Sequence, residues 1–144
     1  MAINDARVRE ILMSAPTVAV LGINDQRDKA AYYVPAYLHE AGYRVIGVNP
    51  KLAGTQMFGG AVQATLTEIA EPVDLVDVFR RPEAIPAHIE EILAMKPRPR
   101  VVWFQLGIEN DDAAAILEAS GITVVQNRCT MADHQRLHLR APTR

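Results

Sequence analysis

The 144-residue sequence has little cysteine, no long apolar run and no surplus of either charge. Its single cysteine, Cys129, cannot form a disulfide within the chain, and no secretory leader is evident, so we expect a protein of the reducing cytoplasm. No segment approaches the roughly 18 consecutive apolar residues of a membrane-spanning helix. With 15 basic against 17 acidic residues the net charge is −2, which argues against a nucleic-acid partner because such domains are usually strongly basic.

Sequence motifs that mark catalytic and metal sites are missing as well. The chain has no G-x-S-x-G nucleophile elbow, no Walker A sequence and no H-E-x-x-H motif. His134 and His138 have the spacing of one helix face, but two histidines without a third ligand make a weak metal site. We therefore expect no catalytic constellation and no metal centre.

What the sequence does contain is a globular composition with alternating elements. Hydrophobic residues make up 49% and charged residues 22% of the chain, and the length fits a single domain, taken as residues 1–144. Short apolar segments rich in β-branched residues predict five strands, and the stretches between them have helical patterns. The expected strands are 17–22, 43–48, 73–79, 101–105 and 122–125. The expected helices follow Asn4 and cover 31–41, 64–70, 82–94, 110–120 and 131–139.

This alternation predicts an α/β fold, a doubly wound parallel sheet in a Rossmann-like three-layer sandwich. Parallel neighbours need right-handed crossovers, and the economical strand order is 3-2-1-4-5. Pro35 is expected in the first turn of its helix, where a proline needs no hydrogen-bond partner. In such sheets ligands bind outside the carboxyl ends of the strands, which gives the expected place of the site.

The first two strand ends favour a phosphorylated nucleotide over a common dinucleotide. Gly22 closes the first strand, where a glycine permits a tight turn and close approach of a phosphate. The later glycines of G-x-G-x-x-G are absent, and the second strand ends in Asn49 and Lys51 where an NAD site has an acid. Together with Lys29 in the first loop, these residues indicate a phosphate ligand, although a solvated lysine is the alternative for Lys51.

The third and fourth strand ends carry further candidates. Phe79, Arg80 and Arg81 can stack on a base or bind phosphate, but an arginine before a proline is also a common helix start. Gln105 and Gly107 follow the fourth strand on the expected ligand edge, and we interpret them as binding residues.

Two residues near these ends allow other interpretations. Trp103 is expected in the core, because strand alternation places it opposite Phe104. Cys129 follows Arg128 just before the last helix, where a cation and a helix N-terminus can lower a thiol pKa and make it reactive. Cys129 can equally be a small buried apolar residue.

With these strand ends in view, the chain resembles the small stand-alone coenzyme A (CoA)-binding proteins related to the nucleotide-binding domain of the succinyl-CoA synthetase α subunit. The resemblance covers nearly the whole length. It is carried by the segments 18–22, 42–51, 76–80, 102–107 and 127–129. It implies a Rossmann-like fold with CoA along the carboxyl ends of the strands, and no established catalytic activity for the stand-alone members.

Site residues carried over from the resemblance cover four strand ends. Gly22, Ile23, Asn24, Asp25 and Lys29 look like the turn that receives the phosphates. Asn49, Pro50 and Lys51 resemble the second contact, while Phe79, Arg80 and Arg81 resemble the third. Gln105 and Gly107 resemble the edge that meets the pantetheine arm. The first loop departs from the family, in which serine or threonine near Asn24, proline near Arg27 and arginine at Lys29 are common.

The function expected from these observations is binding of CoA or an acyl-CoA, in a regulatory or accessory role in acyl-CoA metabolism. The phosphohistidine segment and the ATP-grasp half of the synthetase have no counterpart, so acyl-CoA ligation by this chain alone is not expected. The alternative is an NAD(P)-binding oxidoreductase or redox sensor. A third hypothesis makes Cys129 a redox thiol that forms a mixed disulfide with CoA.

Overall fold

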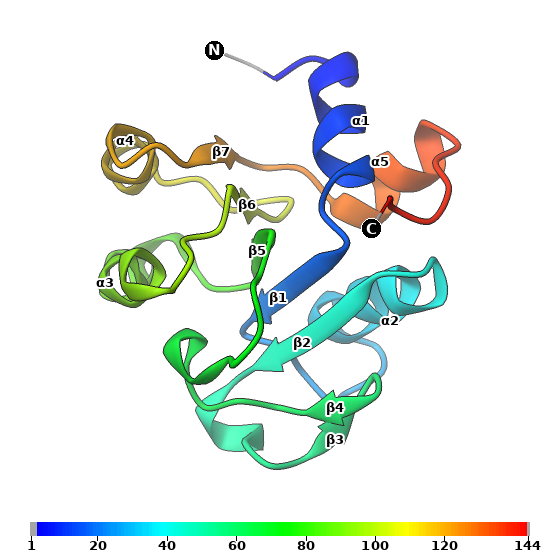
Figure 1. The fold of residues 1–144 in the computed structure, drawn as a ribbon, viewed down its shortest axis with the longest axis vertical. Helices are drawn as coiled ribbons and strands as arrows, with labels where there is room; N and C mark the ends of the chain where they lie inside the picture. Colours follow the sequence, from blue (N-terminus) through cyan, green and yellow to red (C-terminus); the bar gives the residue numbers. More distant parts are fainter. Residues whose placement is uncertain (1–2, 144) are drawn as a thin grey trace.

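The computed structural model describes residues 3–143 and has a parallel five-stranded sheet between two layers of helices (Figure 1). The strands are β1 (Thr17–Leu21), β2 (Arg44–Val48), β5 (Leu75–Val78), β6 (Val101–Phe104) and β7 (Thr123–Val125). The predicted α/β class, the parallel sheet and the number of main strands are confirmed.

The predicted strand order is wrong, and one residue explains the difference. The order is β2-β1-β5-β6-β7, so the third long strand, β5, lies beside β1 and not beside β2. The place beside β2 is taken by Gln63, which forms a parallel bridge to Val48 and exchanges backbone hydrogen bonds with Gly47 and Asn49. If this bridge is counted as a reduced third strand, the sheet has the doubly wound order 3-2-1-4-5-6.

Five helices cover the sheet, three on one face and two on the other (Figure 1). Residues of α1 (Asp5–Met13) and α2 (Ala30–Glu40) pack on one face, beside α5 (Thr130–Arg136), whereas α3 (Pro86–Ala94) and α4 (Asp111–Ala119) pack on the other. Within residues 3–143 no helix is long and apolar enough to cross a membrane.

The connections depart from the sequence expectation in three places. The helix expected at 64–70 is a single 3₁₀ turn, Leu66–Glu68, and a 3₁₀ turn at Pro82–Ala84 precedes α3. A short hairpin, β3 (Gln56–Met57) and β4 (Gly60–Ala61), was not predicted because each strand has only two residues.

Alternate side chains of the strands enter two separate apolar cores. Val18, Val20 and Leu75 face α1 and α2, whereas Ala19 and Val76 face α3 and α4. Trp103 and Phe104 are fully buried on opposite faces, which confirms the expected core position of the tryptophan.

Pro35 lies in the middle of α2, not in its first turn as predicted. Its missing N–H leaves the carbonyl of Ala31 without its usual helical partner. The backbone N–H of Asn24 donates to this carbonyl at 3.1 Å. The proline is therefore compatible with the helix because it lets the loop after β1 bond to α2.

Candidate ligand site at the carboxyl edge of the sheet

Three exposed cations follow three neighbouring strands. Lys51 follows β2, Lys29 precedes α2 in the loop after β1, and Arg80 follows β5. The strands β2, β1 and β5 are adjacent and parallel, so these residues belong to one edge of the sheet. In the part of the chain that the structure describes, none of the three has an acidic partner within ion-pair distance. This edge therefore offers uncompensated positive charge in a protein of net charge −2.

Gly22 lets the ends of these three strands come close together. Its φ is +89°, and a Cβ atom there would lie 2.5 Å from the carbonyl oxygen of Phe79 and 3.1 Å from Cδ of Arg80. Its N–H donates to the carbonyl of Val48 at 2.8 Å. The glycine thus shapes the edge, but its own N–H group is used within the protein.

The next three residues of the first loop have different surroundings. Ile23 is buried against Gly47, where a Cβ atom would lie 2.8 Å from its Cδ1. The side-chain oxygen of Asn24 accepts the N–H of Gln26 at 2.8 Å, which closes a local turn. Asp25 is exposed and carries the wrong charge for a phosphate contact. The structure brings these residues to the expected edge but leaves them mainly a role in loop conformation.

Asn49 holds the first and second loops together. Its Nδ2 donates to the carbonyl of Ile23 at 2.8 Å, and its Oδ1 accepts the N–H of Lys51 at 2.9 Å. Pro50 begins the 3₁₀ turn Pro50–Leu52 that Asn49 caps. Both ends of the Asn49 amide bond to the backbone in this way, so Asn49 orients the segment that carries Lys51.

The segment after β5 supplies one free and one paired cation. Arg80 packs its aliphatic stem over Gly22, and Phe79 is partly buried against the core. Arg81 lies 3.7 Å from Glu83, with both side chains mostly exposed. Such an exposed pair contributes little to stability, so Arg81 stays accessible to a stronger anion.

A cavity of about 450 Å³ opens beside these strand ends. We call it the Pro50 groove. It is lined by Leu21, Pro50, Ala64, Thr65, Ala87, His88, Glu90, Glu91 and Ala94. His88 Nδ1 lies 2.8 Å from the Glu91 carboxylate on the same wall. The groove has the size of a small-ligand site and lies between the β2 end and α3, next to the turn that carries Lys51.

Gln105 and Gly107 are placed differently from each other. Gln105 is only 3% exposed, and its Nε2 donates to Asp77 Oδ1 at 2.7 Å and to Thr130 Oγ1 at 2.9 Å. Gly107 is exposed at a φ of +86° in the turn closed by the bond from the Ile108 N–H to the Gln105 carbonyl. The amide nitrogen of Gln105 therefore points into the protein, and Gly107 lies on the surface.

Asp77 is the residue that the sequence analysis missed. It is fully buried in β5, and burial raises the pKa of its carboxyl. The hydrogen bonds from Gln105 and Thr130 lower this pKa by a smaller amount, and the result is a pKa of about 7. The available signal was an acidic residue inside an apolar strand that is covered on both faces.

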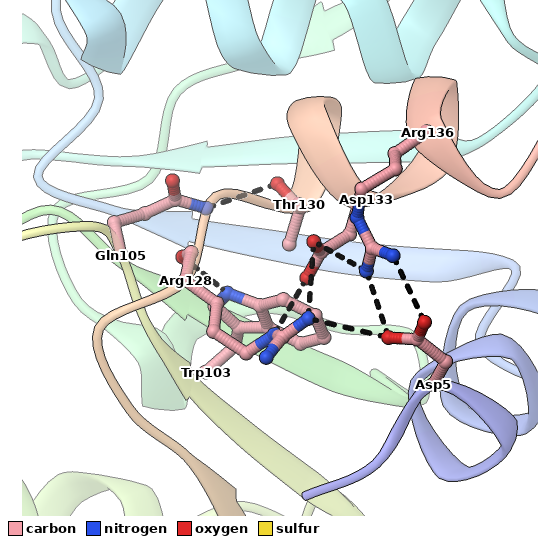
Figure 2. Close-up of polar contacts among 7 residues, drawn as sticks. All are labelled: Asp5, Trp103, Gln105, Arg128, Thr130, Asp133 and Arg136. Atoms are coloured by element: carbon pink, nitrogen blue, oxygen red, sulfur yellow. Dashed lines mark hydrogen bonds and ion pairs between the residues drawn. The ribbon is translucent and has the colours of Figure 1, made fainter.

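At the far end of the edge, Arg128 is part of an ion-pair network (Figure 2). Its guanidinium contacts the Asp133 carboxylate at 2.8 and 3.2 Å and lies 3.8 Å from Asp5, which also pairs with Arg136 at 2.9 Å. The carbonyl of Arg128 accepts the indole N–H of Trp103 at 2.7 Å. Arg128 thus joins β7, α5 and α1, and its charge is already compensated by carboxylates.

Cys129 does not have the expected activated environment. Burial raises the pKa of its thiol, the carboxylates of Asp77 and Asp133 raise it further, and backbone amides of α5 lower it. Arg128, the cation expected to lower the pKa, is held by Asp133. The interpretation of Cys129 as a half-buried apolar residue fits these surroundings better than a reactive thiolate.

His134 and His138 do not form a shared site. His134 is buried and uses both ring nitrogens, with the Tyr37 hydroxyl at 2.7 Å and the carbonyl of Arg140 at 2.9 Å. His138 is exposed beyond the end of α5. Over residues 3–143 no group of three or more His, Cys, Asp or Glu residues is placed to hold a metal ion.

Comparisons with known proteins find similarity over most of the chain. The CoA binding domain family matches residues 16–135. The uncharacterised protein YneT of Bacillus subtilis (strain 168) is 35% identical over 129 residues, which are 90% of this chain and 93% of that protein.

Two solved structures have the same fold. The chain called cell-free ID.343 from Thermus thermophilus is 44% identical with a TM-score of 0.89, over 94% of this chain and 99% of that one. A hypothetical protein from Pyrococcus horikoshii OT3 is 32% identical with a TM-score of 0.87, over 94% and 93% of the two chains. The expected resemblance is confirmed by the family match, and the chain belongs to the CoA binding domain family.

Proposed function

We propose that this protein binds CoA or an acyl-CoA at the carboxyl edge of β2, β1 and β5. The observation that carries the proposal is the set of three unpaired cations on three adjacent strand ends, Lys51, Lys29 and Arg80, beside the Pro50 groove. CoA has a ribose phosphate and a diphosphate, and cations without acidic partners bind such groups through charge-assisted hydrogen bonds. The family match supports CoA as the ligand.

The parts of the ligand can be assigned to parts of this edge. In doubly wound folds the residue after the second strand lies near the nucleotide ribose, so Lys51 is proposed to bind the ribose phosphate. The diphosphate is assigned to Lys29, Arg80 and the N-terminus of α2, whose N-cap residue Lys29 makes no side-chain cap hydrogen bond. The Pro50 groove is proposed to take the adenine, because its walls combine apolar residues with a few polar groups.

The pantetheine arm is proposed to continue over the turn that carries Gly107. Leu106 in this turn is 69% exposed and offers an apolar surface to the arm. We propose a binding role in acyl-CoA metabolism, regulatory or accessory, for one domain that spans the chain. The proposal includes no chemical step.

Calorimetry with matched ligands and variants tests the proposal. We expect saturable CoA binding, weaker binding of dephospho-CoA, which lacks the ribose phosphate, and little binding of NADP⁺. Lys51→Met is expected to weaken CoA by about tenfold, the effect of one charged hydrogen bond, and to leave dephospho-CoA nearly unchanged. Lys96→Met is the control, because Lys96 lies between α3 and β6, at the opposite end of the sheet. No CoA binding at millimolar concentration, or equal losses in both variants, would refute the proposal.

A further inference from the structure

Three buried polar side chains form a ring of hydrogen bonds under the carboxyl edge. Gln105 Nε2 lies 2.7 Å from Asp77 Oδ1 and 2.9 Å from Thr130 Oγ1, and Thr130 Oγ1 lies 3.1 Å from Asp77 Oδ2. Gln105 directly follows β6, Asp77 lies in β5 and Thr130 begins α5, and they are 3%, 0% and 1% exposed. Polar groups buried so deeply are costly unless they are paired, so the direction of each hydrogen bond is strongly determined.

Counting donors and acceptors gives the orientation of the Gln105 amide. Above about pH 7 the Asp77 carboxyl is ionised and only accepts, so the Thr130 hydroxyl donates to one of its oxygens and the Gln105 NH₂ group donates to the other. The second proton of that NH₂ group goes to the Thr130 oxygen. Both protons of the Gln105 amide are therefore used inside the protein, and its Oε1 is the atom that is left over.

The Oε1 atom of Gln105 has no partner within residues 3–143 of the protein. Figure 2 shows it pointing away from Thr130, on the opposite side of the amide from the hydrogen-bonded nitrogen. It has no hydrogen-bond partner among the residues described, and no fully buried side-chain polar atom in this part of the chain lacks a partner. This oxygen therefore keeps a small accessible area although Gln105 as a whole is 3% exposed, and Gln105 follows β6, the strand next to the one that precedes Arg80.

We propose that Asp77 is a positioning residue that holds the Gln105 amide with its oxygen toward the ligand, where it accepts a hydrogen bond from a ligand N–H. In CoA these donors are the two amides of the pantetheine arm, so the inference rests on the proposed function. A flipped amide places Oε1 against the Asp77 carboxylate and presents an NH₂ group to the ligand. Asp77 thus selects a ligand with a hydrogen-bond donor at this position.

Conservative and disruptive variants separate positioning from general support of the fold. Asparagine keeps an acceptor oxygen for Gln105, whereas leucine has nearly the same shape and no acceptor. Serine at position 130 keeps the hydroxyl, whereas valine keeps the shape and loses it. Asp77→Asn and Thr130→Ser are thus the conservative changes, and Asp77→Leu and Thr130→Val are the disruptive ones. If Asp77→Leu fails to fold, Thr130→Val still tests the ring.

The first measurement uses the free protein. The side-chain NH₂ signal of Gln105 is identified in nitrogen-15 NMR spectra by its loss in Gln105→Met, and its hydrogen exchange is then measured. We expect slow exchange in the unmodified protein and in both conservative variants, and exchange at least tenfold faster in the disruptive ones. Slow exchange that persists in Asp77→Leu and Thr130→Val would overturn the proposed orientation.

The second measurement is calorimetric titration with CoA. Each disruptive variant is expected to raise Kd by about 3- to 10-fold, the effect of one hydrogen bond, and each conservative variant by less than about twofold. In a Gln105→Met background, Asp77→Leu is expected to cause no further loss, because Asp77 acts through Gln105.

Two outcomes of the titration contradict the inference in different ways. An equal loss with and without Gln105 means that Asp77 supports the fold and does not act through the amide. Absence of CoA binding by the unmodified protein overturns the proposed function and the ligand part of the inference, whereas the exchange measurement still decides whether Asp77 orients Gln105.

Discussion

The buried carboxyl of Asp77 predicts an unusual pH dependence of folding stability. Burial raises its pKa from the usual 3.8 to about 7, so between these pH values the folded protein binds a proton that the unfolded chain releases. The direction of the pH dependence of stability follows from this difference in bound protons. The contribution of Asp77 to stability is fully present below about pH 4 and is lost as the pH rises through 7. Above pH 7 the folded protein holds a buried charge whose solvation the unfolded chain regains.

The size of this effect can be estimated from the pKa shift. A shift from 3.8 to about 7 corresponds to about 4 kcal/mol, since each pKa unit is about 1.4 kcal/mol. About 3 kcal/mol of this total falls between pH 5 and pH 8. That is a large part of the roughly 5–15 kcal/mol that stabilises an ordinary domain.

Asp77→Asn removes the titration and nearly keeps the shape. The free energy of unfolding of this variant, minus that of the unmodified protein, is therefore expected to rise by about 3 kcal/mol from pH 5 to pH 8. Urea unfolding of both proteins at pH 5, 6, 7 and 8, with linear extrapolation, measures this difference. Carboxylates whose pKa is lowered, such as Asp5 beside Arg136, are present in both proteins and cancel. Parallel stability curves over this range would refute the reasoning.

Three further predictions concern other positions. Gly22→Ala is expected to destabilise the fold by at least about 2 kcal/mol in urea unfolding, because the new Cβ clashes with the Phe79 carbonyl at a positive φ; a smaller loss means that the strand ends can separate easily. Trp103→Phe should cost at least about 1 kcal/mol in the same assay, because the Arg128 carbonyl loses its indole donor; equal stability would contradict this. Iodoacetamide should modify Cys129 at pH 7 more slowly than a cysteine in an unfolded peptide, as followed by intact mass, since burial raises the thiol pKa; faster modification would restore the reactive-thiol hypothesis.

The strands and their core positions could be predicted from the sequence, whereas their order could not. Apolar runs with β-branched residues are local signals, and they located all five long strands and the burial of Trp103. The order depended on Gln63, whose single bridge to β2 has no apolar pattern. The position of Pro35 within its helix was predicted wrongly for a similar reason. The N–H group that bonds to the Ala31 carbonyl, where Pro35 has none to offer, belongs to Asn24 in the loop after β1.

The strand ends could likewise be predicted, but not the direction of each side chain. Lys29, Lys51 and Arg80 lie on the expected edge because parallel strands bring their carboxyl ends together. The inward direction of the Gln105 nitrogen depends on Asp77 and Thr130, which lie 28 and 25 residues away in the chain. No local pattern reports such a pairing, and an acidic residue inside a buried strand was the one available indication.

Binding of CoA at the carboxyl edge is tested most directly by mapping its effect on backbone amide signals in NMR spectra. The account predicts saturable shifts that concentrate at Gly22, Lys29, Lys51, Arg80 and Gly107, while signals around Lys96 at the opposite end of the sheet stay in place. Shifts concentrated elsewhere, for example at the cavity of about 530 Å³ beside β7 that Glu118 and Val124 help to line, would contradict it. An unchanged spectrum at millimolar CoA would contradict it as well.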